Sequence, residues 1–256
     1  MNYSLHSHTP FCHHAQGTPE EYVQQAIKIG LSTFGFSDHA PFKVEGHEES
    51  GFRICTDDFP KYIDTILTLK EKYKDYIDVR LGLECEYFPD YFESQLEYYK
   101  KMGIEYLICG QHFTDCEYFE CAACGFATED INILKKYTDR VISAIKSGKF
   151  TYICHPDLIN YTGDDEYYDG FVRDICLASV EYDTPLELNG LGIREGRHYP
   201  TDKFWSRVSQ YNPDVAFGLD AHTTAHAGDL NSYYDAVLWA KKYNLNLKNT
   251  INIKNI

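Results

Sequence analysis

Histidines and carboxylates recur at matching positions along this chain, directly after short apolar segments. In chain order, the polar groups that follow seven such segments are His6, His8 and His14; Asp38 and His39; Glu84; His112; His155; Asn189 and Arg194; and Asp220 and His222. Seven of the 11 histidines occupy such positions, whereas His13, His47, His198 and His226 do not. Chance does not explain this pattern well.

These residue types suggest metal binding. Neutral imidazole and carboxylate are ligands suited to Zn, Fe or Mn. In His6-Ser7-His8 the two-residue period of a strand directs both imidazoles to the same side, as two ligands of one ion require. Nine such groups are too many for one ion with four to six ligands, so the sequence predicts two or three metals. We expect Asp38 to orient a ligand imidazole rather than to bind a metal itself.

The segments that precede these groups have the composition of strands and alternate with helix-like segments, which predicts an α/β fold with a mainly parallel sheet. The expected strands are Tyr3–Leu5, Thr33–Phe36, Val79–Leu83, Tyr106–Cys109, Tyr152–Cys154, Leu186–Leu188 and Val215–Leu219. The expected helices lie near 19–29, 59–73, 91–102, 129–146, 167–179, 202–210 and 230–243. A β/α barrel would bring the carboxyl ends of these strands together at one mouth.

The first helix has the clearest boundaries. Thr18 is the expected N-cap, Pro19 occupies the first helical position and Glu21 completes a capping box. Gly30 stands where a C-terminal glycine is typical.

The composition of the chain limits which binding partners and which cellular compartment we expect. The net charge of −15 and pI of about 5.1 argue against a surface for nucleic acid or an acidic membrane. No segment approaches the ~20 apolar residues of a membrane span, and the N-terminus does not resemble a signal peptide, so we expect a cytoplasmic protein. Nine scattered cysteines favour reduced thiols. Cys116, Cys121 and Cys124 resemble only half of a structural zinc site.

Taken together, these motifs resemble the histidinol-phosphate phosphatases of the PHP family, and the likeness spans almost the whole chain. The motifs are, in order, His6-Ser7-His8-Thr9-Pro10-Phe11-Cys12 with His14; Ser37-Asp38-His39-Ala40-Pro41-Phe42; Leu81-Gly82-Leu83-Glu84-Cys85-Glu86-Tyr87; Gly110-Gln111-His112-Phe113; His155-Pro156-Asp157-Leu158; Glu187-Leu188-Asn189 with Gly192-Ile193-Arg194; and Gly218-Leu219-Asp220-Ala221-His222.

The resemblance implies a distorted, TIM-like (β/α)7 barrel that forms a single domain over residues 1–256 and holds three divalent metal ions, of Zn, Fe or Mn. The implied ligands are His6, His8, Glu84 and Asp220 for the first ion; His14, His39 and His222 for the second; and Glu84, His112 and His155 for the third. Two features depart from the family. Gly110-Gln111 replaces the usual serine-valine, and the doublet His13-His14 offers two candidates, of which we choose His14 from its spacing after Cys12.

The resemblance also implies the reaction, which is hydrolysis of L-histidinol phosphate to L-histidinol and phosphate in histidine biosynthesis. We expect a metal-bridging hydroxide to attack phosphorus. Arg194 matches a family position, and with its neighbours Arg197 and His198 it would bind the phosphate. Asp220 and His198 are the expected catalytic residues, although the general acid is either His198 or a metal-bound water.

The substrate would carry a cationic end, which acidic groups near the rim could attract; Glu117, Glu120, Asp164 and Asp165 lie in loops of suitable position.

Two other functions stay open. The chain could be a PHP-type phosphoesterase that acts on nucleotides or nucleic-acid ends, or a metal-binding protein without catalytic activity. The sequence also leaves open whether the protein is a monomer or a homo-oligomer.

Overall fold

Eight parallel strands form one curved sheet, and their order in the sheet is their order in the chain. The computed structural model describes all residues 1–256. The strands are β1 (Tyr3–Ser4), β2 (Thr33–Phe36), β3 (Asp78–Glu84), β4 (Tyr106–Cys109), β5 (Phe150–Ile153), β6 (Leu186–Asn189), β7 (Asp214–Gly218) and β8 (Asn246–Leu247). The parallel sheet that we expected is therefore confirmed.

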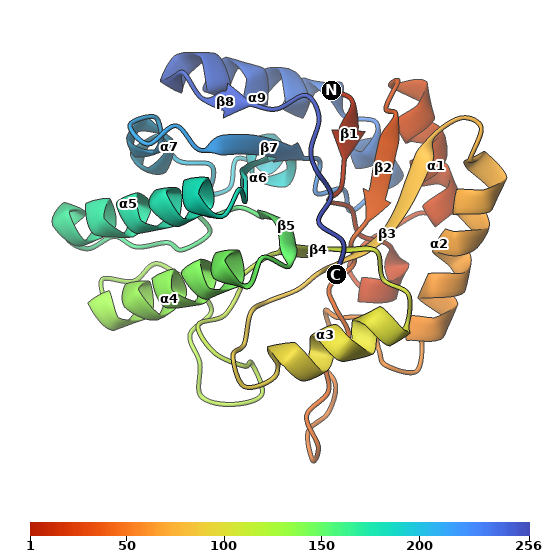
Figure 1. Cartoon of the computed structure of the whole chain (residues 1–256), viewed down its shortest axis with the longest axis horizontal. Coiled ribbons are helices and arrows are strands. Elements are labelled where there is room, and N and C mark those ends of the chain that lie inside the picture. The colour runs from red at the N-terminus through yellow and green to blue at the C-terminus, as the bar shows by residue number, and fades with distance from the viewer.

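Helices cover the outside of the sheet and follow one another around it (Figure 1). They are η1 (Pro10–Cys12), α1 (Pro19–Lys28), α2 (Phe59–Tyr73), α3 (Phe92–Lys101), α4 (Ile131–Ser147), α5 (Asp165–Glu181), α6 (Gly190–Glu195), α7 (Asp202–Val208), α8 (Thr224–Ala227) and α9 (Leu230–Tyr243). None of these helices combines the length and the apolar character that a membrane-spanning segment requires.

Backbone contacts between the ends of β1 and β7 bring the curved sheet back on itself. Ser7 forms a parallel bridge with Ala221, and the His8 amide donates a hydrogen bond of 2.8 Å to the Ala221 carbonyl oxygen. Strands β1 to β7 thus make the distorted β/α barrel that we expected, and the loops that carry the histidines and carboxylates lie at the carboxyl ends of the strands. This closure joins the first metal-ligand motif of the sequence to the last.

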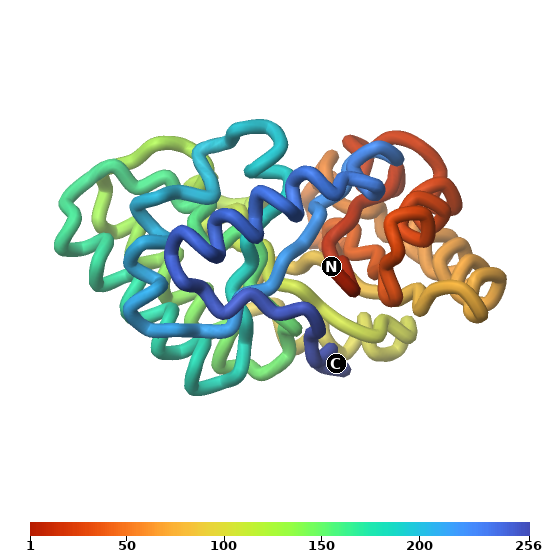
Figure 2. The backbone as a smooth tube through the Cα atoms, turned by 90° about the horizontal axis from the view of Figure 1, so that it is seen from above, coloured from red at the N-terminus to blue at the C-terminus, as the bar shows by residue number.

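The short strand β8 was not expected. Its sequence, Asn246-Leu247, has no run of β-branched or aromatic residues. It is a strand because it pairs with Asp214 and Val215 of β7. The chain then continues to the C-terminus, which lies below the N-terminus in the view of Figure 2. Along this last segment, Ile251 and Ile253 pack against the side chains inside the barrel.

Two hydrophobic regions stabilise the barrel. The larger, of 53 buried residues, lies between the sheet and the helices. A smaller cluster of seven includes Tyr3, Leu5 and Tyr106. The Tyr106 hydroxyl lies 2.8 Å from the Leu5 carbonyl oxygen and 3.1 Å from the Phe36 carbonyl oxygen, and its single O–H can donate to either, so this side chain of β4 reaches the ends of β1 and β2 across the interior.

The predicted helix boundaries agree closely with the structure. Thr18 and Glu21 form both hydrogen bonds of the capping box, and α2 and α9 have the expected limits. The short helices α6 and α8 were missed because four to six residues are too few for a periodic apolar pattern. The Asn189 side chain caps α6 by accepting from the Gly192 amide.

All nine cysteines are unpaired. Cys116 packs with Phe42 and Phe88, whereas Cys124 belongs to the large core cluster. These two thiols therefore act as packing residues in separate apolar regions.

We predict that Gly82→Ala destabilises the fold. A Cβ atom at this position would lie 2.3 Å from the Tyr106 ring, so the substitution forces the interior to expand. We expect the free energy of unfolding to fall by roughly 1–3 kcal/mol, measured by urea denaturation in the presence of a chelator. Gly170→Ala in α5 is the control, because its nearest new contact is at 4.0 Å. Equal losses in the two variants would contradict the proposed packing conflict.

Candidate metal centre and active site

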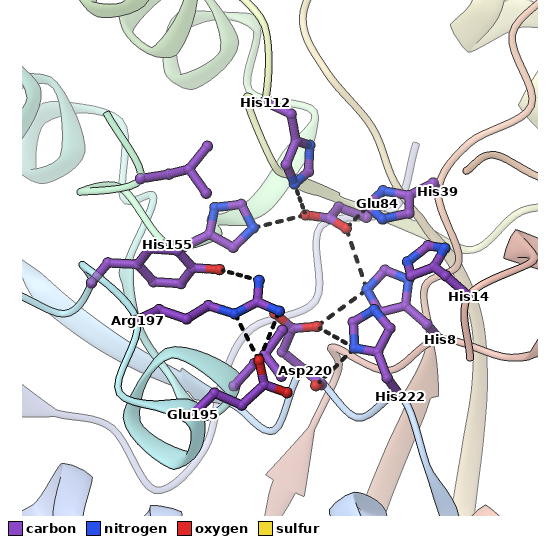
Figure 3. Close-up of a pocket in the computed structure, with 13 residues that line it drawn as sticks. His8, His14, His39, Glu84, His112, His155, Glu195, Arg197, Asp220 and His222 are labelled. Atoms are coloured by element: carbon purple, nitrogen blue, oxygen red, sulfur yellow. Dashed lines mark hydrogen bonds and ion pairs between the residues drawn. The ribbon is translucent and has the colours of Figure 1, made fainter. Parts of the chain in front are cut away.

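The side chains that follow the strands meet in one pocket of about 310 Å³ (Figure 3). The pocket is lined by His8, His14, His39, Glu84, His112, His155, Leu158, Leu191, Glu195, Arg197, Tyr199, Asp220 and His222. His6 lies beneath this surface and is fully buried. The structure thus brings together all nine residues that we expected to bind metal.

Glu84 lies at the centre of one group of imidazoles. Its Oε2 atom is 3.1 Å from His39 Nδ1 and 3.4 Å from His8 Nε2. Its Oε1 atom is 3.1 Å from His155 Nε2 and 3.6 Å from His112 Nε2. Because each oxygen faces different imidazoles, this carboxylate has the geometry to bridge two ions.

Asp220 is the second central carboxylate. Its Oδ1 atom is 3.6 Å from His6 Nε2, 3.4 Å from His8 Nε2 and 3.3 Å from His222 Nδ1. Burial alone would raise its pKa, but His6, His8 and His222 hold the pKa well below its ordinary value. Asp220 is therefore anionic at neutral pH, as a metal ligand must be.

His14 is the member of the histidine doublet that faces this cluster. Its ring centroid is 4.9 Å from that of His222 and 5.2 Å from that of His39. His13 points elsewhere, with Nε2 3.3 Å from the Cys55 sulfur. The backbone separates the two rings because His13 ends helix η1 in the left-handed conformation, with φ of 65°.

Two more carboxylates fix the orientation of imidazoles in this cluster. His6 Nδ1 donates to Glu187 Oε1 at 2.8 Å, and His112 Nδ1 donates to Glu86 Oε1 at 2.9 Å. In both rings Nε2 is left to face the central carboxylates. Neither glutamate was expected to have a role. Glu86 nevertheless lies two residues after Glu84, and Glu187 lies two residues before Asn189. Side chains two residues apart on a strand point to the same side of the sheet, so this spacing could have identified both glutamates.

The expectation that Asp38 orients an imidazole was wrong. Its Oδ1 atom accepts hydrogen bonds from the Thr9 amide at 2.8 Å and the Thr9 hydroxyl at 2.9 Å. Asp38 therefore holds the turn between His8 and helix η1. It positions the loop that carries His14 and does not contact a ring.

The donor set suits divalent metal ions. Burial lowers the pKa of His8 to about 3 and that of His39 well below its ordinary value, so both imidazoles are neutral at pH 7 and keep a lone pair. His6 Nε2 and Asp220 Oδ1 are buried without a hydrogen-bond partner. Buried polar atoms normally have partners, and a cation among these atoms would supply one.

The backbone is also strained at this site. His155 and Asp220 have positive φ values of 28° and 47°, a region that non-glycine residues rarely adopt. Such strain persists where the surrounding structure imposes it, and it is concentrated at functional sites. Here it turns two side chains at the barrel mouth toward the common pocket.

Arg197 and Glu195 lie side by side in another part of the pocket (Figure 3), and Tyr199 also lines the pocket. Glu195 Oε2 is 2.8 Å from Arg197 Nη2, and Arg197 Nη1 donates to the Tyr199 hydroxyl at 3.2 Å. Tyr199 packs its ring 5.5 Å from that of His155. A cationic and an anionic side chain thus stand together opposite the histidine cluster.

Two residues that we expected at the substrate are placed elsewhere. Arg194 does not line this pocket. Its guanidinium donates to the Asp220 carbonyl oxygen at 3.2 Å and pairs with Asp229 at 3.3 Å, because helix α6 directs it beneath the Asp220 turn. His198 Nε2 donates to the Leu158 carbonyl oxygen at 2.7 Å and also lies outside the lining. This placement does not support substrate binding by either residue, or His198 as the general acid.

Comparison with known proteins supports the same family that the motifs suggest. The family model described as PHP domain matches residues 4–190. The chain is 27% identical over 268 residues to a histidinol-phosphatase of Bacillus subtilis, with 91% of this chain and 97% of that protein covered. It is 33% identical over 254 residues to a probable histidinol-phosphatase of Schizosaccharomyces pombe, with 89% and 83% covered.

A solved structure has the same fold. The histidinol phosphate phosphatase of Lactococcus lactis, in complex with zinc, L-histidinol and phosphate, superposes with a TM-score of 0.74 at 19% sequence identity. The superposition covers 100% of this chain and 98% of that protein. At this level of identity the likeness establishes the fold alone.

We predict that Glu187→Gln weakens metal binding. One oxygen of Glu187 accepts a hydrogen bond from His6 Nδ1, and the other accepts one from the His155 backbone amide at 3.0 Å. A glutamine side chain would replace one of these oxygens with an NH2 group, which would face a donor. We expect 10–100-fold weaker metal affinity, measured by titration against a competing chelator. Glu105→Gln, at the opposite end of the barrel, is the control. Unchanged affinity in Glu187→Gln would refute this role.

Asp38 should also make stability depend on pH. Burial raises its pKa to about 7 from an ordinary value of 3.8, so between these values the folded chain keeps a proton that the unfolded chain has lost. The stability that Asp38 contributes therefore falls as the pH rises. We expect the unfolding free energy of the unsubstituted protein, minus that of Asp38→Asn, to decrease by a few kcal/mol from about pH 4 to about pH 7. Metal-free protein should be used, and a difference independent of pH would contradict the assignment.

Proposed function

The chain belongs to the PHP domain family, and we propose that it is a metal-dependent phosphatase that hydrolyses L-histidinol phosphate to L-histidinol and inorganic phosphate. The observation that carries this proposal is the convergence of seven histidines and two carboxylates around one pocket, with Arg197 opposite them. Curated relatives that align over most of their length with this chain are named histidinol-phosphatases.

We further propose that the pocket holds three divalent ions of Zn, Fe or Mn. The assignment follows the three groups of side chains: His6, His8, Glu84 and Asp220; His14, His39 and His222; and His112 and His155 with Glu84 shared. Nine ligand residues exceed the needs of one ion, and the two oxygens of Glu84 face separate imidazoles.

Phosphate monoesters are hard to hydrolyse because their negative charge repels nucleophiles, so the site must offset charge. Bound divalent ions would supply Lewis acidity, which neutralises phosphoryl oxygens and lowers the pKa of a coordinated water toward neutrality. Arg197 would add a guanidinium, which stays charged and binds two oxygens of a phosphate at once. The Tyr199 hydroxyl, 3.2 Å from Arg197 Nη1, would keep this guanidinium directed across the pocket.

Glu195 offers a basis for substrate preference. Histidinol phosphate carries an amino group and an imidazole that can be cationic, and Glu195 is the pocket carboxylate outside the metal cluster. It would attract this end while Leu158 and Leu191 contact the carbon skeleton. Of the four acidic residues that we considered for this role, Glu117 pairs with Arg53 and Asp165 with Lys203.

The net charge of −15 favours a small substrate over a nucleic acid, because a long polyanion would be repelled. The acidic chain has no basic sequence tract comparable to those of nucleic-acid-binding proteins. We therefore propose a cytoplasmic enzyme of small-molecule metabolism rather than a phosphoesterase of nucleic-acid ends.

The proposal predicts both metal content and substrate range. The purified protein should release phosphate from histidinol phosphate faster than from other small monoesters or a diester, and a chelator should abolish release. Adding back Zn, Fe or Mn separately would identify the active metal. A protein that holds at most one ion and releases nothing from any monoester would refute the proposal, and faster diester cleavage would favour the nucleic-acid alternative.

Replacing Arg197 should separate phosphate binding from the metal centre. For Arg197→Met we expect kcat/KM for histidinol phosphate to fall roughly 10–100-fold, because charge-assisted hydrogen bonds to the phosphate are lost while metal content stays the same. Arg173→Met is the control, since Arg173 forms an exposed ion pair with Asp174 on α5. An unchanged kcat/KM in Arg197→Met would exclude this arginine as a phosphate ligand.

A further inference from the structure

We propose that Arg53 is a positioning residue for the metal centre, which acts by fixing Glu86 and through it the imidazole of His112. The inference rests on the proposed function, because it concerns the ion that His112, His155 and Glu84 would share. Arg53 lies in the segment between His39 and α2, and no feature of its sequence context marked it as functional.

A continuous chain of contacts joins Arg53 to the pocket. Its Nη1 atom is 2.7 Å from Glu86 Oε2, and Glu86 Oε1 accepts from His112 Nδ1 at 2.9 Å. His112 Nε2 then faces Glu84 Oε1 at 3.6 Å. Arg53 and Glu86 are each 2% exposed, so water does not compete for these hydrogen bonds.

The guanidinium itself is held on several sides. Nε donates to Glu117, which lies in the loop after His112, and Nη1 also donates to the Ala40 carbonyl oxygen at 3.3 Å. Its Cζ atom lies 4.8 Å from the centre of the Phe52 ring. These contacts give the guanidinium one orientation, which is a condition for transmitting position to Glu86.

The same short segment supports a second ligand. The Phe52 ring meets the His39 ring edge to face at 5.2 Å, and the Ile54 amide donates to the His39 carbonyl oxygen at 3.1 Å. Residues 52–54 therefore contact His39 directly and reach His112 through Glu86. The imidazoles of His39 and His112 belong to different βα loops, and residues 52–54 help to fix the position of both rings.

Without the Arg53 guanidinium, the side-chain carboxylates of Glu86 and Glu117, which both pair with it, would remain near each other with no cation between them. Like charges at short range in a dry environment repel strongly. Glu86 would then move away from Glu117 and lose its alignment with His112. A ligand imidazole that is free to turn binds a metal more weakly than one that is held in place.

The test compares Arg53→Met with Arg53→Lys. We expect Arg53→Met to lose one ion per chain or to bind its weakest ion 10–100-fold less tightly, measured by metal analysis and by titration with zinc against a competing chelator. Arg53→Lys should recover part of this loss, because lysine restores the charge but not the planar fork of donors. Arg140→Met is the matched control, since Arg140 anchors the same loop through Asp115 without touching a ligand histidine.

A double-mutant cycle distinguishes positioning from a general effect on folding. If Arg53 acts through Glu86, adding Arg53→Met to Glu86→Gln should weaken metal affinity no further than Glu86→Gln alone. Additive losses, or unchanged affinity in Arg53→Met, would overturn the inference. If Arg53→Met does not fold, as judged by the melting temperature of the metal-free protein, Arg53→Lys and Glu86→Gln are compared in its place, and normal zinc affinity in both would overturn it.

Failure of this inference can be distinguished from failure of the proposed function. Phosphate release by the unsubstituted protein tests the function, whereas zinc affinity across the variants tests Arg53. Active unsubstituted protein together with normal zinc affinity in Arg53→Met would reject the positioning role alone.

Discussion

The structure depends on keeping two buried carboxylates, Glu84 and Asp220, within reach of imidazole nitrogens on every side. Distances of 3.1 to 3.6 Å join their oxygens to six histidines. Asp220 reaches this position because the end of β7 bridges to the end of β1, beside His6 and His8. The bridge that closes the barrel therefore also assembles the site, since breaking it would separate Asp220 from His6 and His8.

Charged groups farther from the pocket stabilise this arrangement. Glu187 holds His6 and the His155 backbone, and Arg194 holds the Asp220 turn. Each contact is buried or partly buried, where an unpaired charge is costly, so each group constrains its neighbour. These contacts explain how a strained backbone at Asp220 can persist.

The two halves of the pocket have different chemistry. On the histidine side His8, Glu84 and Asp220 are buried, whereas Arg197 and Glu195 are exposed and pair with one another. An exposed ion pair contributes little to stability, so a substrate that carries both a phosphate and a cationic group could replace it at small cost. Selectivity would then come from the exposed half and catalysis from the buried half.

Seven of the strands, the longer helices and the convergence of the histidines and carboxylates could be predicted from the sequence, because apolar periodicity and capping are local and parallel strands end at one edge. What the tertiary structure decided were contacts between distant segments. In the folded chain Arg194 donates to the Asp220 carbonyl oxygen, and His198 donates to the Leu158 carbonyl oxygen. Asp38 accepts a hydrogen bond from the Thr9 amide, and Arg53 forms an ion pair with Glu86. Side-chain direction depends on which segments pack together, and no local pattern encodes such neighbours. For the same reason β8 became a strand only through its pairing with β7.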